Sequence, residues 1–113
     1  MEAAIQALAE PRRREILQLV RDRELTVGEI AAQFEVSRPA ISQHLKVLRE
    51  AGLVSDRRDG TRRYFRAEPR GFVELRAFLE GFWDSRLEMI RVAAEAEARE
   101  RASLEDGGER DDE

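Results

Sequence analysis

Apolar side chains recur at helical spacing from the start of the chain. Ile5 and Leu8 predict a short first helix that ends before Pro11. Pro11 suits the first position of a second helix, where its missing N–H costs no hydrogen bond, and this helix is expected to end near Asp22. The inward-facing residues of the second helix are Ile16, Leu17 and Val20.

Two further helices are marked by their capping residues. Thr26 and Glu29 have the spacing of a capping box, and an apolar stripe follows as far as Phe34. Ser37 is the next N-cap, and Gly52 supplies the stop for the helix that Ser37 starts. Because only a tight turn separates these helices, they predict a helix-turn-helix. The second of them has an inward stripe of Ile41, Leu45 and Leu48.

A hairpin and a long helix are predicted after Gly52. Val54–Arg58 and Arg62–Ala67 flank Asp59-Gly60, a dipeptide that favours a two-residue turn with positive φ at both positions. Beyond Pro69, apolar residues keep helical spacing along one broad face. These residues are Phe72, Leu75, Phe78, Leu79, Phe82, Trp83, Leu87 and Ile90.

The elements together predict a mainly α fold with a small β-hairpin. Its order, about five helices and a two-stranded wing after the helix-turn-helix, is that of a winged helix-turn-helix. We expect one such domain over residues 1–100. Residues 101–113 are acidic and lack apolar periodicity, so we expect this tail to be disordered.

The net charge of −4 conceals a basic segment. Residues 100–113 carry seven acidic and two basic side chains, a net charge of −5, whereas residues 37–67 carry eight basic and three acidic side chains, a net charge of +5. The acidic balance therefore does not describe the surface formed by the second helix of the helix-turn-helix and the hairpin, where a polyanion could bind.

Several classes of site and location are disfavoured. The chain has no cysteine, which excludes disulfides and thiolate metal sites. We find no glycine-rich phosphate loop, nucleophile triad or metal motif, so we expect no enzyme active site and no cofactor. No signal peptide or membrane-length apolar stretch is present, and we expect a cytoplasmic protein with no membrane partner.

The helix after Ser37 carries the candidate base-reading residues. If Ile41 and Leu45 face the core, the opposite face presents groups that match base edges in the major groove, where Gln suits adenine and Arg suits guanine. Ser37, at the helix N-terminus, could meet a phosphate. The predicted DNA contacts of this helix are Ser37, Arg38, Pro39, Ser42, Gln43, His44, Lys46 and Arg49.

The hairpin adds a cluster of arginines. A solvated polar face would explain the helix alone, but a hairpin gains nothing from self-repelling cations unless a polyanion neutralises them. We therefore predict contacts of the hairpin with double-stranded DNA. The predicted residues are Arg57, Arg58, Arg62, Arg63 and Tyr64, with Arg66 also in the cluster.

Two groups of residues leave alternatives open. Arg12, Arg13 and Arg14 could meet phosphates, but salt bridges to Glu10, Glu15 or a partner subunit are favoured. The aromatic residues of the last helix could line an effector pocket, although packing in a dimer interface is favoured. No effector can be named from the sequence.

From about Ile5 to Ile90 the chain resembles the ArsR/SmtB family of winged helix-turn-helix regulators. The resemblance rests on residues 9–17, 25–31 and above all 37–54, Ser-Arg-Pro-Ala-Ile-Ser-Gln-His-Leu-Lys-Val-Leu-Arg-Glu-Ala-Gly-Leu-Val, and continues through the wing at residues 58–65. It implies a homodimer built on the first and last helices, which represses a promoter by occluding it. The dimer contacts expected on this basis are Ile5, Leu8, Phe72, Leu75, Leu79, Phe82, Trp83, Leu87 and Ile90.

The chain departs from the family at its metal sites. Where metal-sensing relatives place a Cys-x-Cys, this chain has Thr26 and Gly28. Its single histidine, His44, lies in the predicted recognition helix, so we expect no metal site. The leading hypothesis is a sequence-specific repressor on a pseudo-palindromic operator. The alternative is a winged-helix interaction module that docks an acidic protein or RNA.

Overall fold

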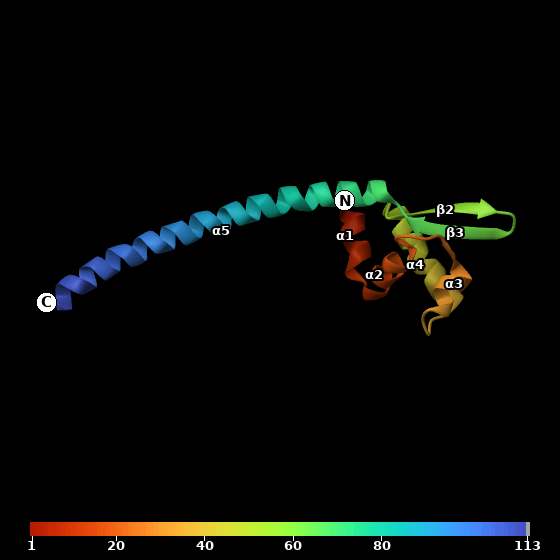
Figure 1. Ribbon diagram of the computed structural model, residues 1–113, viewed down its shortest axis with the longest axis horizontal. Helices are drawn as coiled ribbons and strands as arrows, with labels where there is room; N and C mark the ends of the chain where they lie inside the picture. The colour runs from red at the N-terminus through yellow and green to blue at the C-terminus, as the bar shows by residue number, and fades with distance from the viewer. Residues whose placement is uncertain (113) are drawn as a thin grey trace. The chain divides into compact units, whose positions relative to one another are not determined.

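The computed structural model describes the backbone of residues 1–112 and the side chains of residues 1–104 (Figure 1). Residues 1–77 form one compact unit, and the chain from Phe78 onward forms a second. The elements, in chain order, are α1 (Glu2–Ala9), α2 (Pro11–Val20), β1 (Leu25–Thr26), α3 (Val27–Ala32), α4 (Arg38–Glu50), β2 (Val54–Asp59), β3 (Arg62–Ala67) and α5 (Pro69–Asp112). The predicted winged helix-turn-helix order of elements is confirmed.

Arginines at the start of α2 bind the C-terminal end of α1. Glu10 is extended between the two helices, which leaves the last carbonyls of α1 without helical partners. Arg13 Nε donates to the Ala7 carbonyl at 2.7 Å, and Arg14 Nη1 donates to the Leu8 carbonyl at 2.7 Å. Arg12 instead pairs with Glu15 at 3.1 Å, which is one of the salt bridges that the sequence favoured. The first turn of α2 thus fixes α1 in place.

Both capping predictions for the helix-turn-helix are confirmed. The Thr26 hydroxyl accepts from the Glu29 N–H at 3.2 Å, and the Glu29 carboxylate accepts from the Thr26 N–H at 3.0 Å. The hydrogen bond that the Glu29 carboxylate accepts from the Thr26 backbone, followed by the effect of the Thr26 side chain, lowers the pKa of Glu29. The Ser37 hydroxyl accepts from the Ala40 N–H at 3.3 Å and caps α4. Gly52, with a φ of 78°, provides the expected end of α4.

The wing differs from the prediction in its turn and its number of strands. Asp59 pairs with Arg62, so the two-residue turn is Gly60-Thr61 and not Asp59-Gly60. Of the two turn residues, only Gly60 has a positive φ, at 65°, as a turn with glycine in its first central position requires. The sheet is three-stranded in the order β1-β3-β2, because Leu25 and Thr26 pair with the far side of β3. The sequence did not predict β1 because its two residues are too few to show the alternation of apolar and polar side chains that marks a strand.

The core of the first unit lies among α2, α3, α4 and the inner face of the sheet. The inward stripes predicted for α2 and α4 are confirmed as buried. Phe65 covers this core from β3, and Leu75 closes it from the first turns of α5. The fully buried large residues are Ile16, Val20, Ile30, Ile41, Leu45, Leu48 and Leu53.

In the second unit, α5 continues as a single helix through Asp112. Disorder was expected for residues 101–113; the structure gives helix as far as Asp112, and Glu113 lies outside the described residues. Ion pairs one turn apart support α5 over residues 91–101: Arg91 pairs with Glu95 at 2.9 Å, and Arg101 pairs with Glu97 at 2.7 Å. None of the helices in the described part of the chain is both apolar and long enough to cross a membrane.

The substitution Thr26→Ala removes the hydroxyl half of the capping box. We expect it to lower the free energy of unfolding by about 1 kcal/mol, as for other N-cap threonines. Urea unfolding followed by circular dichroism measures this loss. Thr61→Ala in the exposed wing turn is the matched control, and an equal loss in both variants would contradict the capping role.

Candidate nucleic-acid interface

The outer face of α4 is exposed along its length. Burial of Ile41 and Leu45 holds α4 at one rotation, because both side chains are almost completely covered. The opposite face, as predicted, carries exposed residues. They are Arg38, Pro39, Ser42, Gln43, Lys46 and Arg49.

Arg38 lies across the start of α3. A Cβ built on Gly28 would stand 2.8 Å from Arg38 Nη2 and 3.0 Å from Arg38 Cζ. The guanidinium therefore packs where any larger residue at position 28 would displace it. Gly28 is a residue of this site that sequence reasoning considered only as the place of a missing metal ligand.

The arginines of the wing fall into two groups. The half-buried Asp56 accepts a hydrogen bond from Arg63 Nε and lies 3.9 Å from Arg49 Nη1, so it joins β2 to α4 and β3. Arg57 Nε donates to Glu24 at 2.6 Å, and the Arg57 guanidinium stacks on the Tyr64 ring at 4.8 Å. Arg49, Arg57 and Arg63 therefore brace the wing, and their predicted contacts with DNA stay predictions.

Three other basic residues of α4 and the wing have no carboxylate partner among the described side chains. Lys46, Arg58 and Arg62 are exposed and make no ion pair with any residue whose side chain the structure describes. Desolvating such a cation against a phosphate breaks no existing ion pair. These three residues, together with Arg38, Ser42 and Gln43, are called the α4–wing surface below.

Two hollows show that α4 and the wing form one continuous surface. One, of about 560 Å³, is lined by Gly28, Arg38, Thr61 and Arg62, among others. The other, of about 180 Å³, is lined by Ser42, Lys46, Arg49 and Arg63. Residues from the recognition helix and from the hairpin thus face the same spaces, which the sequence predicted but could not demonstrate.

His44 packs against α2. Its Nδ1 lies 3.5 Å from Arg13 Nη1, in the geometry of an acceptor for the guanidinium N–H. Burial, and then the positive charge of Arg13, lower the pKa of His44 below its usual value of 6.5. Through Arg13, which also binds the carbonyls of Gln6 and Ala7, His44 links the recognition helix to α1. No group of three or more potential metal ligands is present among the described residues.

The predicted dimer residues differ in their exposure. Leu75 is buried within its own chain, and Leu8 and Phe72 pack partly against that core. Leu75 therefore belongs to the core of the chain, and its predicted place in a dimer interface stays a prediction. In contrast, a group of large apolar side chains is exposed. They are Ile5, Phe78, Leu79, Phe82, Trp83, Leu87 and Ile90.

Comparison with known proteins gives consistent matches. Residues 10–56 match the family described as bacterial regulatory protein, arsR family. The chain is 50% identical to the HTH-type transcriptional regulator Rv2034 of Mycobacterium tuberculosis, over 73% of this chain and 77% of that protein. It is 40% identical to the transcriptional repressor SdpR of Bacillus subtilis, over 58% of this chain and 72% of that protein.

A solved structure shares the fold. The homodimeric winged helix-turn-helix DNA-binding domain Mb0332 of Mycobacterium bovis has a TM-score of 0.61 and 34% identity, and the match covers 74% of this chain and 77% of that one. The similarity therefore extends over about three quarters of each protein and includes the winged helix-turn-helix itself.

The lowered pKa of His44 predicts how stability depends on pH. The unfolded chain binds a proton near the usual pKa, whereas the folded chain does not until a lower pH, so stability falls as the pH decreases through about 6.5. His44→Gln cannot titrate and lacks this contribution. The difference in unfolding free energy between the wild type and His44→Gln should therefore shrink between about pH 7.5 and about pH 5.5.

Urea titrations of both proteins at each pH measure this difference. A constant difference would contradict the environment described for His44. His44→Gln also removes the hydrogen bond that the neutral Nδ1 accepts from Arg13, and because protonation of His44 breaks the same bond, its loss is part of the pH-dependent difference.

Proposed function

Since the chain belongs to the arsR family of bacterial regulatory proteins, we propose that it reads the sequence of double-stranded DNA as a homodimer and represses the promoter that it occupies. The observation that carries this proposal is the continuity of the α4–wing surface. Arg38, Ser42 and Lys46 of α4 line the same hollows as Arg62 and Arg63 of the adjacent hairpin.

The contacts divide by their chemistry. Gln43 and Arg38 have the length and hydrogen-bonding groups to read base edges in a major groove. Arg58, Arg62 and Lys46 supply charge for phosphates, which position a protein without reading sequence. Asp56 holds the two halves of the surface together by bridging α4 and the wing.

The exposed apolar side chains of α5 support a homodimer. Phe82, Trp83, Leu87 and Ile90 are each about half exposed or more, which is unusual for such large apolar groups on a helix in water. A second copy of the same face would cover them, with two-fold symmetry. Two recognition helices would then meet two half-sites about one helical turn apart. Repression follows from occupancy of such a site, and SdpR is a named repressor.

Gln43→Ala tests base reading. We expect this variant to lose about 1–3 kcal/mol of affinity for the best duplex, and little for random DNA, because its side chain reads an edge and not the backbone. Fluorescence anisotropy with both duplexes measures the two affinities. Equal losses on specific and random DNA would show that Gln43 does not read sequence. An interaction module that docks a protein or RNA by charge would tolerate the change.

Arg62→Ala tests the phosphate contacts. We expect weaker binding to specific and random DNA alike, with the slope of log affinity against log salt reduced by about one for each phosphate that the variant no longer neutralises. Arg99→Ala, on the distal part of α5, is the control that removes the same charge elsewhere. An unchanged slope for Arg62→Ala, or the same change in both variants, would refute the role of the wing.

Gly28→Ala tests the positioning of Arg38. The added methyl group displaces the guanidinium, a flexible group, so we expect no loss of stability but weaker binding to the best duplex. In a protein that already carries Arg38→Ala, Gly28→Ala should weaken DNA binding no further. The coupling energy between the two substitutions should then be about 0.5–3 kcal/mol. Additive losses of binding energy in the double variant would contradict this role of Gly28.

A further inference from the structure

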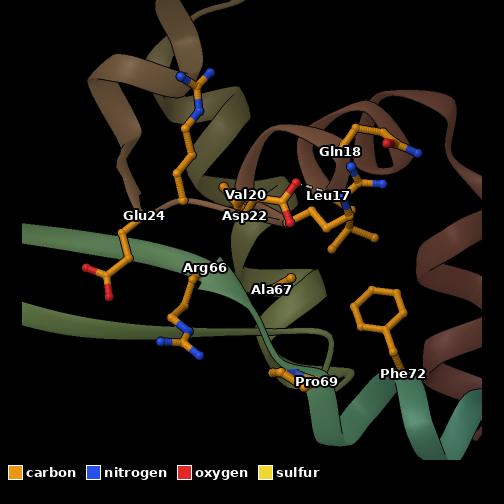
Figure 2. Close-up of a pocket in the computed structure, with 11 residues that line it drawn as sticks. Leu17, Gln18, Val20, Asp22, Glu24, Arg66, Ala67, Pro69 and Phe72 are labelled. Carbon is orange, nitrogen blue, oxygen red and sulfur yellow. Dashed lines mark hydrogen bonds and ion pairs between the residues drawn. The ribbon is translucent and has the colours of Figure 1, made fainter.

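A further hollow lies away from the α4–wing surface. It has a volume of about 590 Å³ and is formed by the end of α2, the loop at residues 21–24, the end of β3 and the first turn of α5 (Figure 2). It shares no lining residue with the α4–wing surface. Small-molecule sites typically enclose about 300–1,000 Å³, so the hollow has the capacity of one.

The floor of the hollow is apolar. Leu17 and Val20 reach it from the core side, and Ala67, Pro69 and Phe72 form the opposite wall. Figure 2 shows the Phe72 ring beside the open space, with Ala67 and Pro69 between it and Arg66. Such a floor favours a ligand with an aromatic or aliphatic body.

The rim has an excess of positive charge. Its two acids are already engaged: Asp22 pairs with Arg21 at 3.0 Å, and Glu24 pairs with Arg57 at 2.6 Å. Arg23 and Arg66, also in the lining, make no ion pair within the described part of the chain. Two cations therefore remain for an anion that enters the hollow.

We propose that this hollow binds an organic carboxylate with an apolar body, which lies on Phe72 and Ala67 and directs its carboxylate to Arg66 and Arg23. The occupant contacts the last residues of the wing and the first turn of α5 at once. It therefore joins the hairpin that carries the phosphate-binding arginines to the helix that carries the exposed apolar face. This proposal goes beyond DNA binding and does not depend on it.

Methyl NMR of the full chain tests the site with 1-naphthoate and its uncharged counterpart 1-naphthalenemethanol as probes. We expect saturable shifts at the methyls of Leu17, Val20 and Ala67, with tighter binding of naphthoate. Arg66→Gln should weaken naphthoate by about two- to fivefold and leave the alcohol unchanged, since an exposed ion pair contributes modestly. Arg58→Gln, which removes a wing arginine outside the hollow, should change neither.

A substitution that fills the hollow provides a second test of the proposed site. Ala67→Trp should abolish binding of both probes while circular dichroism shows the same helix content. Shifts confined to Leu87 and Ile90, or equal weakening by Arg58→Gln, would overturn the proposal. So would shifts at the pocket methyls that appear only on dilution to monomer, because a second copy of the chain would then be the occupant.

Discussion

The burial of one stripe of α4 determines the orientation of every group on this helix that we assign to DNA. Ile41, Leu45 and Leu48 are inaccessible or nearly so, and truncation of any of them to alanine would cost about 2–5 kcal/mol. A helix with this stripe in the core can rotate very little. Gln43 and Lys46 must then face outward, and Ser37 caps the start of the helix, where Ser37 and Arg38 are exposed.

Electrostatics then decides which cations remain available. A cluster of arginines on a hairpin is costly unless each charge is paired or meets an external anion. Asp56 and Glu24 engage three of the basic residues, Arg63, Arg49 and Arg57, and use them to hold the wing to its neighbours. Arg58 and Arg62 are left at the tip. The same acids that brace the wing therefore leave Arg58 and Arg62 without an ion pair among the described residues.

The sequence predicted most of this fold because its signals are local. Capping residues, Pro11 and the apolar stripes fix helices over a few residues, and each of these was found in place. What the sequence could not predict depends on distant partners. The pairing of Leu25 with Phe65 makes the third strand, Glu24 reaches Arg57 across the sheet, and Gly28 receives Arg38 from another helix.

One other difference has a physical cause of its own. The wing turn shifted by one residue because Gly60 takes the positive φ, and Asp59 remains in the strand. Arg101 and Glu97, one turn apart, form an ion pair that supports the helix where this segment begins, and the predicted disorder of residues 101–113 stays a prediction. Composition alone does not distinguish a charged helix from a disordered tail.

The most direct test of the account is a selection of binding sites by the purified protein from a library of random duplex DNA at roughly physiological salt. We expect enrichment of an inverted repeat whose half-sites lie about one helical turn apart, because two α4–wing surfaces related by a two-fold axis would read it. Retention of all sequences alike, without an enriched repeat, would contradict sequence-specific recognition by this surface.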